Sequence, residues 1–301
     1  MSLKLLVNGF FRSGTTILWK ILRDSNPSMS VFYEPCHEQI MDNLKKFRQE
    51  PFDDEVQGFR VWNEYMEIPG LMEKIDKNHP NSGRGNLFPE KAEDVVAYVE
   101  IYDQLKKNCI LQTNRWSFCL AEIGRAYDCR VIHIIRNPFD IYSSMLKVYM
   151  GQGSALKCLI KSALKPFYAG KAYGIIDMYE FVVRKFDHNY GKLDGKSGLL
   201  FKESPFNMFL IVWTLSNYHA IKGLEAIGET VIVYEKFTSN SKRAEKLVER
   251  AGEVLFKCDG VLKKSKRAEF ADNEEKDELI NITEKLGVGK EMRYILTKAA
   301  L

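Results

Sequence analysis

Two short segments carry residues whose types and spacing could bind phosphate groups. The first, VNGFFRSGTT (Val7–Thr16), places Gly9 and Gly14 around a turn that leads into an apolar stretch with helical spacing. At a helix start the backbone amides have no intrahelical acceptor, and the helix dipole attracts negative charge. We therefore expect the amides of residues 14–16 to hold a phosphate, with Arg12 as the cation of this loop. The alternative is that the turn merely starts a helix.

The glycine spacing of this loop matches the phosphate loop of nucleotide triphosphatases, GxxxxGK[ST], except that Thr15 occupies the lysine position. In those enzymes the lysine reaches the outer phosphates, and the hydroxyl that follows it holds a magnesium ion. A loop without that lysine still offers amides and hydroxyls to a phosphate. It is, however, poorly equipped to act on the terminal phosphate of ATP.

The second segment begins with CRVIHIIR (Cys129–Arg136), an apolar and β-branched run that is typical of a buried parallel strand. Asn137 then suits a helix N-cap and is followed by a proline, which suits the first helical position. Arg136 would end the strand at the edge where open α/β sheets bind ligands, with Ser144 two turns along the helix. Together they could hold a second phosphate, whereas the alternative is a local pair between Arg136 and Asp140.

FRSGTT and RNPFDIYSS together resemble the two phosphate motifs of the sulfotransferases that use 3'-phosphoadenosine 5'-phosphosulfate (PAPS). The family's first motif binds the 5'-phosphosulfate. In its second motif an Arg, followed eight positions later by a Ser, binds the 3'-phosphate, which is the spacing of Arg136 and Ser144. A third segment, VIVYEKF (Val231–Phe237), is similar to a late strand of the family, so that the resemblance runs roughly from Leu3 to Asn240.

The resemblance implies PAPS as the sulfuryl donor, its desulfated form PAP as the product, and no required metal. An Arg in the first loop makes the chain more similar to the carbohydrate-directed and bacterial branches than to the animal cytosolic enzymes. Since a sulfuryl group in transfer carries less negative charge than a phosphoryl group, fixed donors and cations can replace a metal. The expected donor-binding residues are Arg12, Ser13, Gly14, Thr15, Thr16, Arg136 and Ser144, and Arg12 also stabilises the leaving phosphate oxygen.

A general base must also accept the proton of the acceptor hydroxyl. A short strand over 31–33 would bring Glu34 out near the first loop, and carbohydrate-directed and bacterial relatives use a Glu in a similar place. We assign the base to Glu34, with His37 as the second candidate. The animal cytosolic branch uses a His where this chain has Asn114, which cannot accept a proton. Alternatively, Glu34 is a structural partner of Arg12 or Arg115.

The composition of the 301 residues, 45% of them hydrophobic, fits one α/β enzyme domain. Its net charge of +4, from 44 basic and 40 acidic residues, gives no support for nucleic-acid binding. The six cysteines form no CxxC pair, which predicts reduced thiols and no metal site. Without a signal sequence or a membrane-spanning apolar stretch, we expect a cytoplasmic enzyme, and the resemblance implies a bacterial one.

We expect a three-layer α/β sandwich with a central parallel sheet, the fold of P-loop nucleotide hydrolases and of the sulfotransferases. A single domain would span residues 1–301, with 151–205 as an insertion that forms the acceptor site or a lid. The charged helical tail from Ala244 onwards would pack outside the sheet, where it could support a homodimer.

The function that we expect is transfer of the sulfuryl group from PAPS to a hydroxyl or amine of an acceptor by in-line attack. The acceptor would be a carbohydrate or a small metabolite. Two alternatives stay open. A P-loop kinase of a small molecule would need magnesium and normally the lysine that Thr15 replaces. A non-catalytic nucleotide-binding module would keep the phosphate loops but have no use for Glu34.

Overall fold

The computed structural model describes residues 1–53, 58–79, 88–89, 92–151, 174–186, 203–229, 231–239, 254–256, 267 and 269–300. Within these ranges five strands form one parallel sheet in the order β2-β3-β1-β4-β5. Their bounds are β1 (Leu3–Gly9), β2 (Ser30–Tyr33), β3 (Cys109–Thr113), β4 (Arg130–Ile135) and β5 (Val231–Val233). The apolar runs over 3–9 and 130–135 are almost entirely buried, as expected of parallel strands that are covered on both faces.

Helices connect and follow these strands. One helix, α1 (Thr15–Ser25), joins β1 to β2, and four lie between β2 and β3: α2 (Ile40–Gln49), α3 (Asn63–Met66), α4 (Leu71–Asn78) and α5 (Ala92–Asp103). The helix α6 (Leu120–Tyr127) precedes β4, and α7 (Pro138–Gly151), α10 (Ile175–Lys185) and α11 (Pro205–Glu225) precede β5. The chain continues with α12 (Tyr234–Ser239), α14 (Asn273–Lys285) and α15 (Gly289–Ala300).

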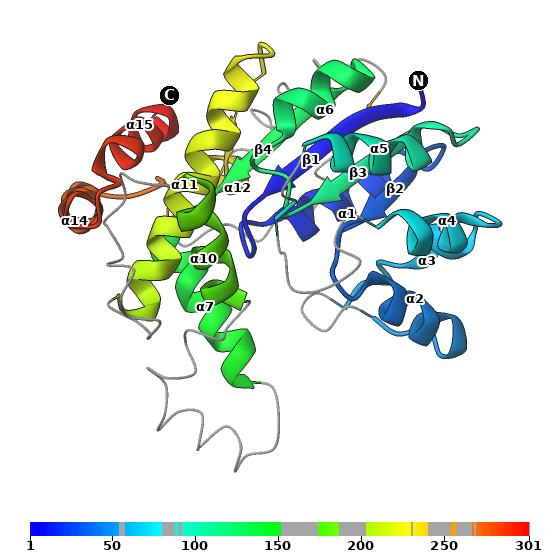
Figure 1. The fold of residues 1–301 in the computed structure, drawn as a ribbon, viewed down its shortest axis with the longest axis horizontal. Coiled ribbons are helices and arrows are strands. Elements are labelled where there is room, and N and C mark those ends of the chain that lie inside the picture. The colour runs from blue at the N-terminus through cyan, green and yellow to red at the C-terminus, as the bar shows by residue number, and fades with distance from the viewer. Residues whose placement is uncertain are drawn as a thin grey trace.

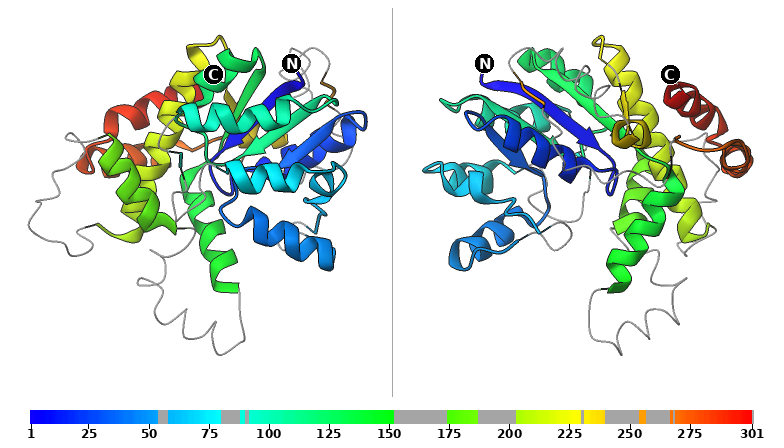
Figure 2. Two further views of the ribbon diagram at one scale, coloured as in Figure 1. Left: turned by 45° about the vertical axis from the view of Figure 1, so that its right-hand side comes forward. Right: turned by 180° about the vertical axis from the view of Figure 1, so that it is seen from behind.

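The helices cover both faces of the sheet. In the views of Figures 1 and 2, α1 and α12 lie against one face, while α5, α6 and α11 cover the opposite face. This division follows from right-handed crossovers, because the chain leaves β1 in one direction along the sheet and returns from β2 in the other. The predicted fold class, a three-layer α/β sandwich around a parallel sheet, is confirmed.

The core consists of two apolar clusters. One fills the space between the sheet, α1 and α5, and the other surrounds α11, whose Phe209 and Trp213 are fully buried. The second cluster also holds apolar side chains from α7, α10, α14 and α15. The apolar composition of α11 therefore reflects contact with helices on several sides, as well as with the sheet.

The predicted N-cap of α7 is confirmed, since Asn137 accepts the backbone N–H of Phe139 at 2.9 Å. Ser204 caps α11 in the same way, by accepting the backbone N–H of Asn207 at 3.2 Å. The late motif VIVYEKF differs from the expected strand, since β5 ends at Val233 and the next residue begins α12. The reason lies in the turn: the carboxylate of Glu235 folds back to accept the backbone N–H of Asn137.

Most of the expected insertion over 151–205 lies outside the described residues, except for Gly151, the segment 174–186 with α10, and residues 203–205. The charged stretch after Ala244 also lies largely outside them, although α14 and α15 confirm that the later tail is helical. Within the described ranges, no helix is long and apolar enough to cross a membrane.

Candidate functional site at the carboxyl edge of the sheet

The loop between β1 and α1 has the shape of a phosphate-binding turn. The backbone N–H of Ser13 donates to the carbonyl of Phe10 at 3.1 Å, and Arg12 and Gly14 have φ angles of +65° and +102°. A Cβ on Gly14 would lie 2.5 Å from the ring of Tyr234. Glycine is therefore required at this position both by the backbone conformation and by the close approach of that ring.

The donors of this turn point to an anionic ligand. The helix α1 begins with no side-chain cap and no acidic residue in its first turn, so the charge of its amino end is not offset locally. The hydroxyl of Ser13 is fully buried and has no hydrogen-bond partner among the protein atoms. A buried hydroxyl beside uncapped helix amides suits the oxygens of a phosphate group.

The second predicted motif meets this loop directly. Arg136 Nη1 donates to the backbone carbonyl of Arg12 at 3.1 Å, and Arg12 Nε donates to Ser144 Oγ at 3.1 Å. The Arg136 guanidinium also lies over the ring of Tyr234, 4.5 Å from its centre. Asp140 pairs with Arg267 at 3.2 Å instead of with Arg136, so the alternative of a local Arg136–Asp140 pair is wrong.

A buried carboxyl supports the turn that carries Arg136. Glu235 is fully buried, and one of its oxygens accepts the backbone N–H of Asn137 at 3.0 Å. Burial raises the pKa of Glu235 to about 7, against opposing hydrogen bonds from backbone amides and attraction from Arg136. The weak late motif was the sequence signal for this residue, but it gave no role to Glu235.

Glu34 lies immediately after β2 in a left-handed conformation with a φ angle of +41°. Its Oε1 accepts from Asn114 Nδ2 at 2.5 Å, and its Oε2 accepts from Arg115 Nη1 at 3.1 Å. Arg115 is buried, also pairs with Glu38, and lies over the ring of Phe11. Glu34 is thus a partner of Arg115, as one alternative held, and Arg12 bonds to Ser144 instead.

Hydrogen bonds join this carboxylate to the phosphate loop. Thr15 Oγ1 donates to Asn114 Oδ1 at 3.0 Å, and Asn114 in turn donates to Glu34. The next residue of the loop, Thr16, shares a hydrogen bond of 3.1 Å with the hydroxyl of Tyr33. The expected donor-binding residues therefore converge, and the expected base is connected to them through one side chain.

The second candidate base, His37, belongs to the turn that follows Glu34. Its backbone N–H donates to the carbonyl of Glu34 at 2.9 Å, and its Nδ1 accepts the backbone N–H of Gln39 at 3.1 Å. Burial lowers the pKa of His37, and the positive charge of Arg115 lowers it further. The lowered pKa favours the neutral imidazole. Because Nδ1 accepts the hydrogen bond from Gln39, the proton of that neutral ring lies on Nε2.

Sequence reasoning named Arg115 only as an alternative partner of Glu34 and gave no supporting role to Tyr234, although both contact the predicted residues. A signal existed for the first, because QTNR follows the apolar part of β3 at the sheet edge where ligands bind. Cys36, close to Glu34 in sequence, is buried and accepts a hydrogen bond from Trp116 Nε1 at 3.1 Å. Burial raises its pKa to about 12, which indicates a packing role.

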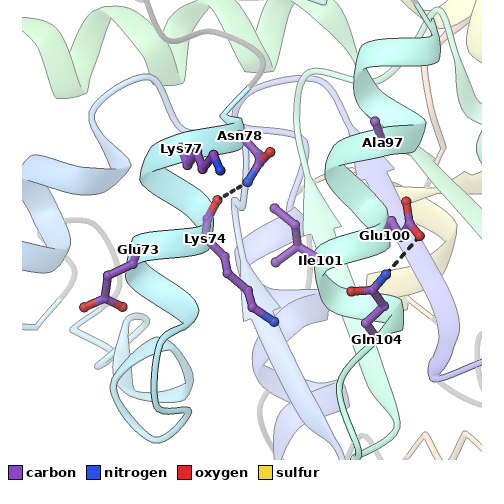
Figure 3. A pocket seen from close by; sticks show the side chains of 8 residues that line it. All are labelled: Glu73, Lys74, Lys77, Asn78, Ala97, Glu100, Ile101 and Gln104. Carbon is purple, nitrogen blue, oxygen red and sulfur yellow. Dashed lines mark hydrogen bonds between the residues drawn. The ribbon is translucent and has the colours of Figure 1, made fainter.

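The described part of the chain offers no cluster of metal ligands, and a groove that it does form lies away from the predicted residues. No group of three or more His, Cys, Asp and Glu side chains there could hold a metal ion. A groove of about 450 Å³ lies between α4 and α5, as Figure 3 shows, with Lys74, Lys77 and Glu100 among its lining residues. None of the predicted site residues lines this groove.

Comparison with known proteins gives two likenesses. No family model matches the chain. An uncharacterized protein of Archaeoglobus fulgidus is 27% identical over 267 residues, which cover 84% of this chain and 85% of that protein. Among solved structures, a sulfotransferase domain from the curacin biosynthetic pathway aligns with a TM-score of 0.41 and 13% identity, over 84% of this chain and 75% of that domain.

Proposed function

We propose that this chain is a PAPS-dependent sulfotransferase that transfers the sulfuryl group to a hydroxyl or amine of a small-molecule or carbohydrate acceptor. One observation carries the proposal: Arg12 is in contact with both Arg136 and Ser144, so the two phosphate motifs form one site. A carboxylate, Glu34, is connected to the same loop through Asn114. Two adjoining anion sites and a nearby base are what a donor with phosphates at both ends requires.

The first loop fits the 5' end of the donor. The uncapped amides of α1 and the buried hydroxyl of Ser13 provide donors to phosphate oxygens, and Thr15 and Thr16 add hydroxyls. Arg136 and Ser144 would hold the 3'-phosphate. When bound, PAPS supplies an activated sulfuryl group, and transfer of this group leaves PAP in the site.

Arg12 would act as a fixed positive charge. The guanidinium of an arginine offers fixed N–H donors and positive charge, which would stabilise negative charge on the leaving phosphate oxygen. The bond from Arg12 Nε to Ser144 Oγ holds the side chain between the two motifs. With Arg136 beside it, the site carries two cations, which supports transfer without a metal ion.

Glu34 would be the general base. Each carboxylate oxygen can accept more than one hydrogen bond, so the bonds from Asn114 and Arg115 orient the group and leave lone pairs for the acceptor proton. His37 remains the second candidate, and it would have to release its hydrogen bond from Gln39 before Nδ1 could accept a proton. We further propose a single domain over residues 1–301, a cytoplasmic location and membership of the carbohydrate-directed or bacterial branch.

Transfer itself tests the proposal. The protein, treated with a chelator, is incubated with radiolabelled PAPS and a panel of sugars, phenols, amines and small alcohols, and labelled products are separated by chromatography. We expect label on at least one class of acceptor and release of PAP without magnesium. Consumption of magnesium-ATP with PAPS left intact would instead favour the kinase alternative, and PAP binding without any turnover would favour the binding module.

A further inference from the structure

Three side chains at the ends of β2 and β3 form a closed ring of hydrogen bonds. The backbone N–H of Glu34 donates to Gln112 Oε1 at 3.3 Å, and Gln112 Nε2 donates to Asn114 Oδ1 at 3.0 Å. Asn114 Nδ2 closes the ring on Glu34 Oε1 at 2.5 Å. All three residues are buried, so these bonds have little competition from water.

One branch of the ring runs from Glu34 Oε2 to Arg115, and another leads to the phosphate loop. Thr15 Oγ1 donates to Asn114 Oδ1, so that this oxygen accepts two hydrogen bonds. The partners fix the orientation of the amide. A flipped Asn114 would place Oδ1 against the carboxylate of Glu34, which only accepts, and Nδ2 against Nε2 of Gln112, which only donates.

The ring also holds a strained backbone. Glu34 has a φ angle of +41°, a conformation that is costly for a residue with a side chain. Such conformations persist where the surroundings hold the residue from several sides. Here Gln112 holds the backbone N–H of Glu34 while Asn114 holds its carboxylate.

We propose that Asn114 is a positioning residue for sulfuryl transfer, which fixes Oε1 of Glu34 relative to the phosphate loop. The inference rests on the proposed function. Asn114 has no proton to exchange at working pH, so it acts through the two side chains that it joins, Glu34 and Thr15. An error of about 1 Å in the position of a reacting group can cost about 100-fold in rate, and a residue that holds the base in place is therefore important.

The test compares two variants of Asn114 with a matched buried asparagine. Asn114→Ala removes the bridge, whereas Asn114→Asp keeps acceptors for Thr15 and Gln112 but sets a second carboxylate against Glu34. The control is Asn26→Ala, because Asn26 is buried after the end of α1 and its side chain bonds to the backbone of Leu22 and Leu255, outside the ring. Three quantities are measured. The first is the rate of PAP release from PAPS, both with water and with the acceptor panel. The other two are the affinity for PAP, by calorimetry, and the free energy of unfolding in urea.

We expect Asn114→Ala to lower kcat by about 10- to 100-fold, as removal of an orienting partner does in other sites, with KM for PAPS and PAP affinity nearly unchanged. Asn114→Asp should lose more, because the new charge repels Glu34. Asn26→Ala should lose stability and keep kcat. The inference is overturned if the Asn114 variants lose only stability, as the control does, or lose PAP affinity in step with kcat.

A double-mutant cycle tests the ring independently of turnover. The unfolding free energies of Asn114→Ala and Glu34→Gln should be non-additive, because the two residues share a hydrogen bond, while Asn26→Ala and Glu34→Gln should add. Additivity in both cycles would contradict the positioning role. A wild-type protein that neither binds PAP nor turns over PAPS would refute the proposed function itself. An active wild-type protein with equally active Asn114 variants would refute only the positioning role of Asn114.

Discussion

The proposed chemistry depends on two residues, Glu34 as the general base and Arg136 as a ligand of the 3'-phosphate. Both residues follow a strand of the sheet, where the side chain leaves the core and meets the phosphate loop through Asn114 or directly. Sequence reasoning selected both from their place in a motif. It could not show that Arg115 holds one oxygen of Glu34, because that contact joins β2 to the end of a strand more than seventy residues away.

Replacement of Glu34 by Gln should lower the rate of transfer by at least about 100-fold, the usual contribution of a general base. PAP affinity should stay close to that of the wild type, because the carboxylate is not among the donors to the phosphates. Glu38→Gln is the matched control, since Glu38 also pairs with Arg115 but is more exposed. Initial rates and calorimetry measure both effects. An active Glu34→Gln protein would remove Glu34 from the role of base.

Replacement of Arg136 by Ala should weaken binding of PAP by about 10- to 100-fold, the equivalent of one charge-assisted hydrogen bond or slightly more. Adenosine 5'-phosphosulfate lacks the 3'-phosphate, so its affinity should change little. Calorimetry with the two nucleotides gives the comparison. An equal loss for both would show that Arg136 does not distinguish the 3'-phosphate.

At the scale of elements, the turn from β1 into α1 and the turn from β4 into α7 are packed on each other through Tyr234. The ring of this residue leaves no room for a Cβ on Gly14, and the Arg136 guanidinium lies over it, 4.5 Å from its centre. Strand and helix patterns predicted both turns, since apolar runs, caps and glycines are local signals. The start of α12 at Tyr234 was not predicted, because it depends on the contact between Glu235 and the distant Asn137.

Gly14→Ala should therefore damage both phosphate motifs. An added Cβ would lie 2.5 Å from the Tyr234 ring at a φ angle of +102°, so either the loop or the ring must move. We expect a loss of about 1–3 kcal/mol in unfolding free energy and a loss of PAP binding of at least tenfold.

Gly70→Ala is the matched control for this change, because Gly70 is also a left-handed N-cap, with a φ angle of +74° and nothing within 4 Å of an added Cβ. Its cost should be about 1 kcal/mol from the backbone alone, with PAP binding intact. Urea unfolding and calorimetry separate the two effects. Equal PAP affinity in both variants would contradict the role given to the Gly14 turn.

At the scale of the whole molecule, strand order decides which residues share the site. The order β2-β3-β1-β4-β5 places β3 between β2 and β1, so the residues after β3 lie between Glu34 and the phosphate loop. Composition and periodicity predicted a parallel α/β sheet but not its order, which depends on packing between distant segments. The sequence shows only that Asn114 stands where the animal cytosolic sulfotransferases have a His. Its position as a bridge between Glu34 and Thr15 follows from the strand order and could not be predicted.

Buried carboxyls should also set part of the pH dependence of stability. Burial raises the pKa of Glu64 to about 7, against the opposing charge of Arg23. The folded state then holds a proton that the unfolded state has lost, so the contribution of Glu64 is full below about pH 4.5 and falls as pH rises through 7. One such group changes the unfolding free energy by up to about 1.4 kcal/mol per pH unit.

We therefore expect Glu64→Gln to gain stability relative to the wild type as pH rises from about 5 to 8. The exposed Glu278→Gln, on α14, is the control and should keep the wild-type profile. Comparison of variant with wild type is needed because buried histidines such as His133, whose pKa burial lowers to about 4, act in the opposite direction. Urea unfolding at each pH gives the difference, and a difference that does not vary with pH would refute the assignment to Glu64.

The proposed function requires that the loop around Gly14, together with Arg136, bind a nucleotide with a 3'-phosphate without a metal ion. The test is calorimetric titration of the chelator-treated protein with PAP, and separately with ATP in the presence and absence of magnesium. We expect tight binding of PAP without metal and much weaker binding of ATP under either condition. Preferential binding of magnesium-ATP would contradict the proposed function.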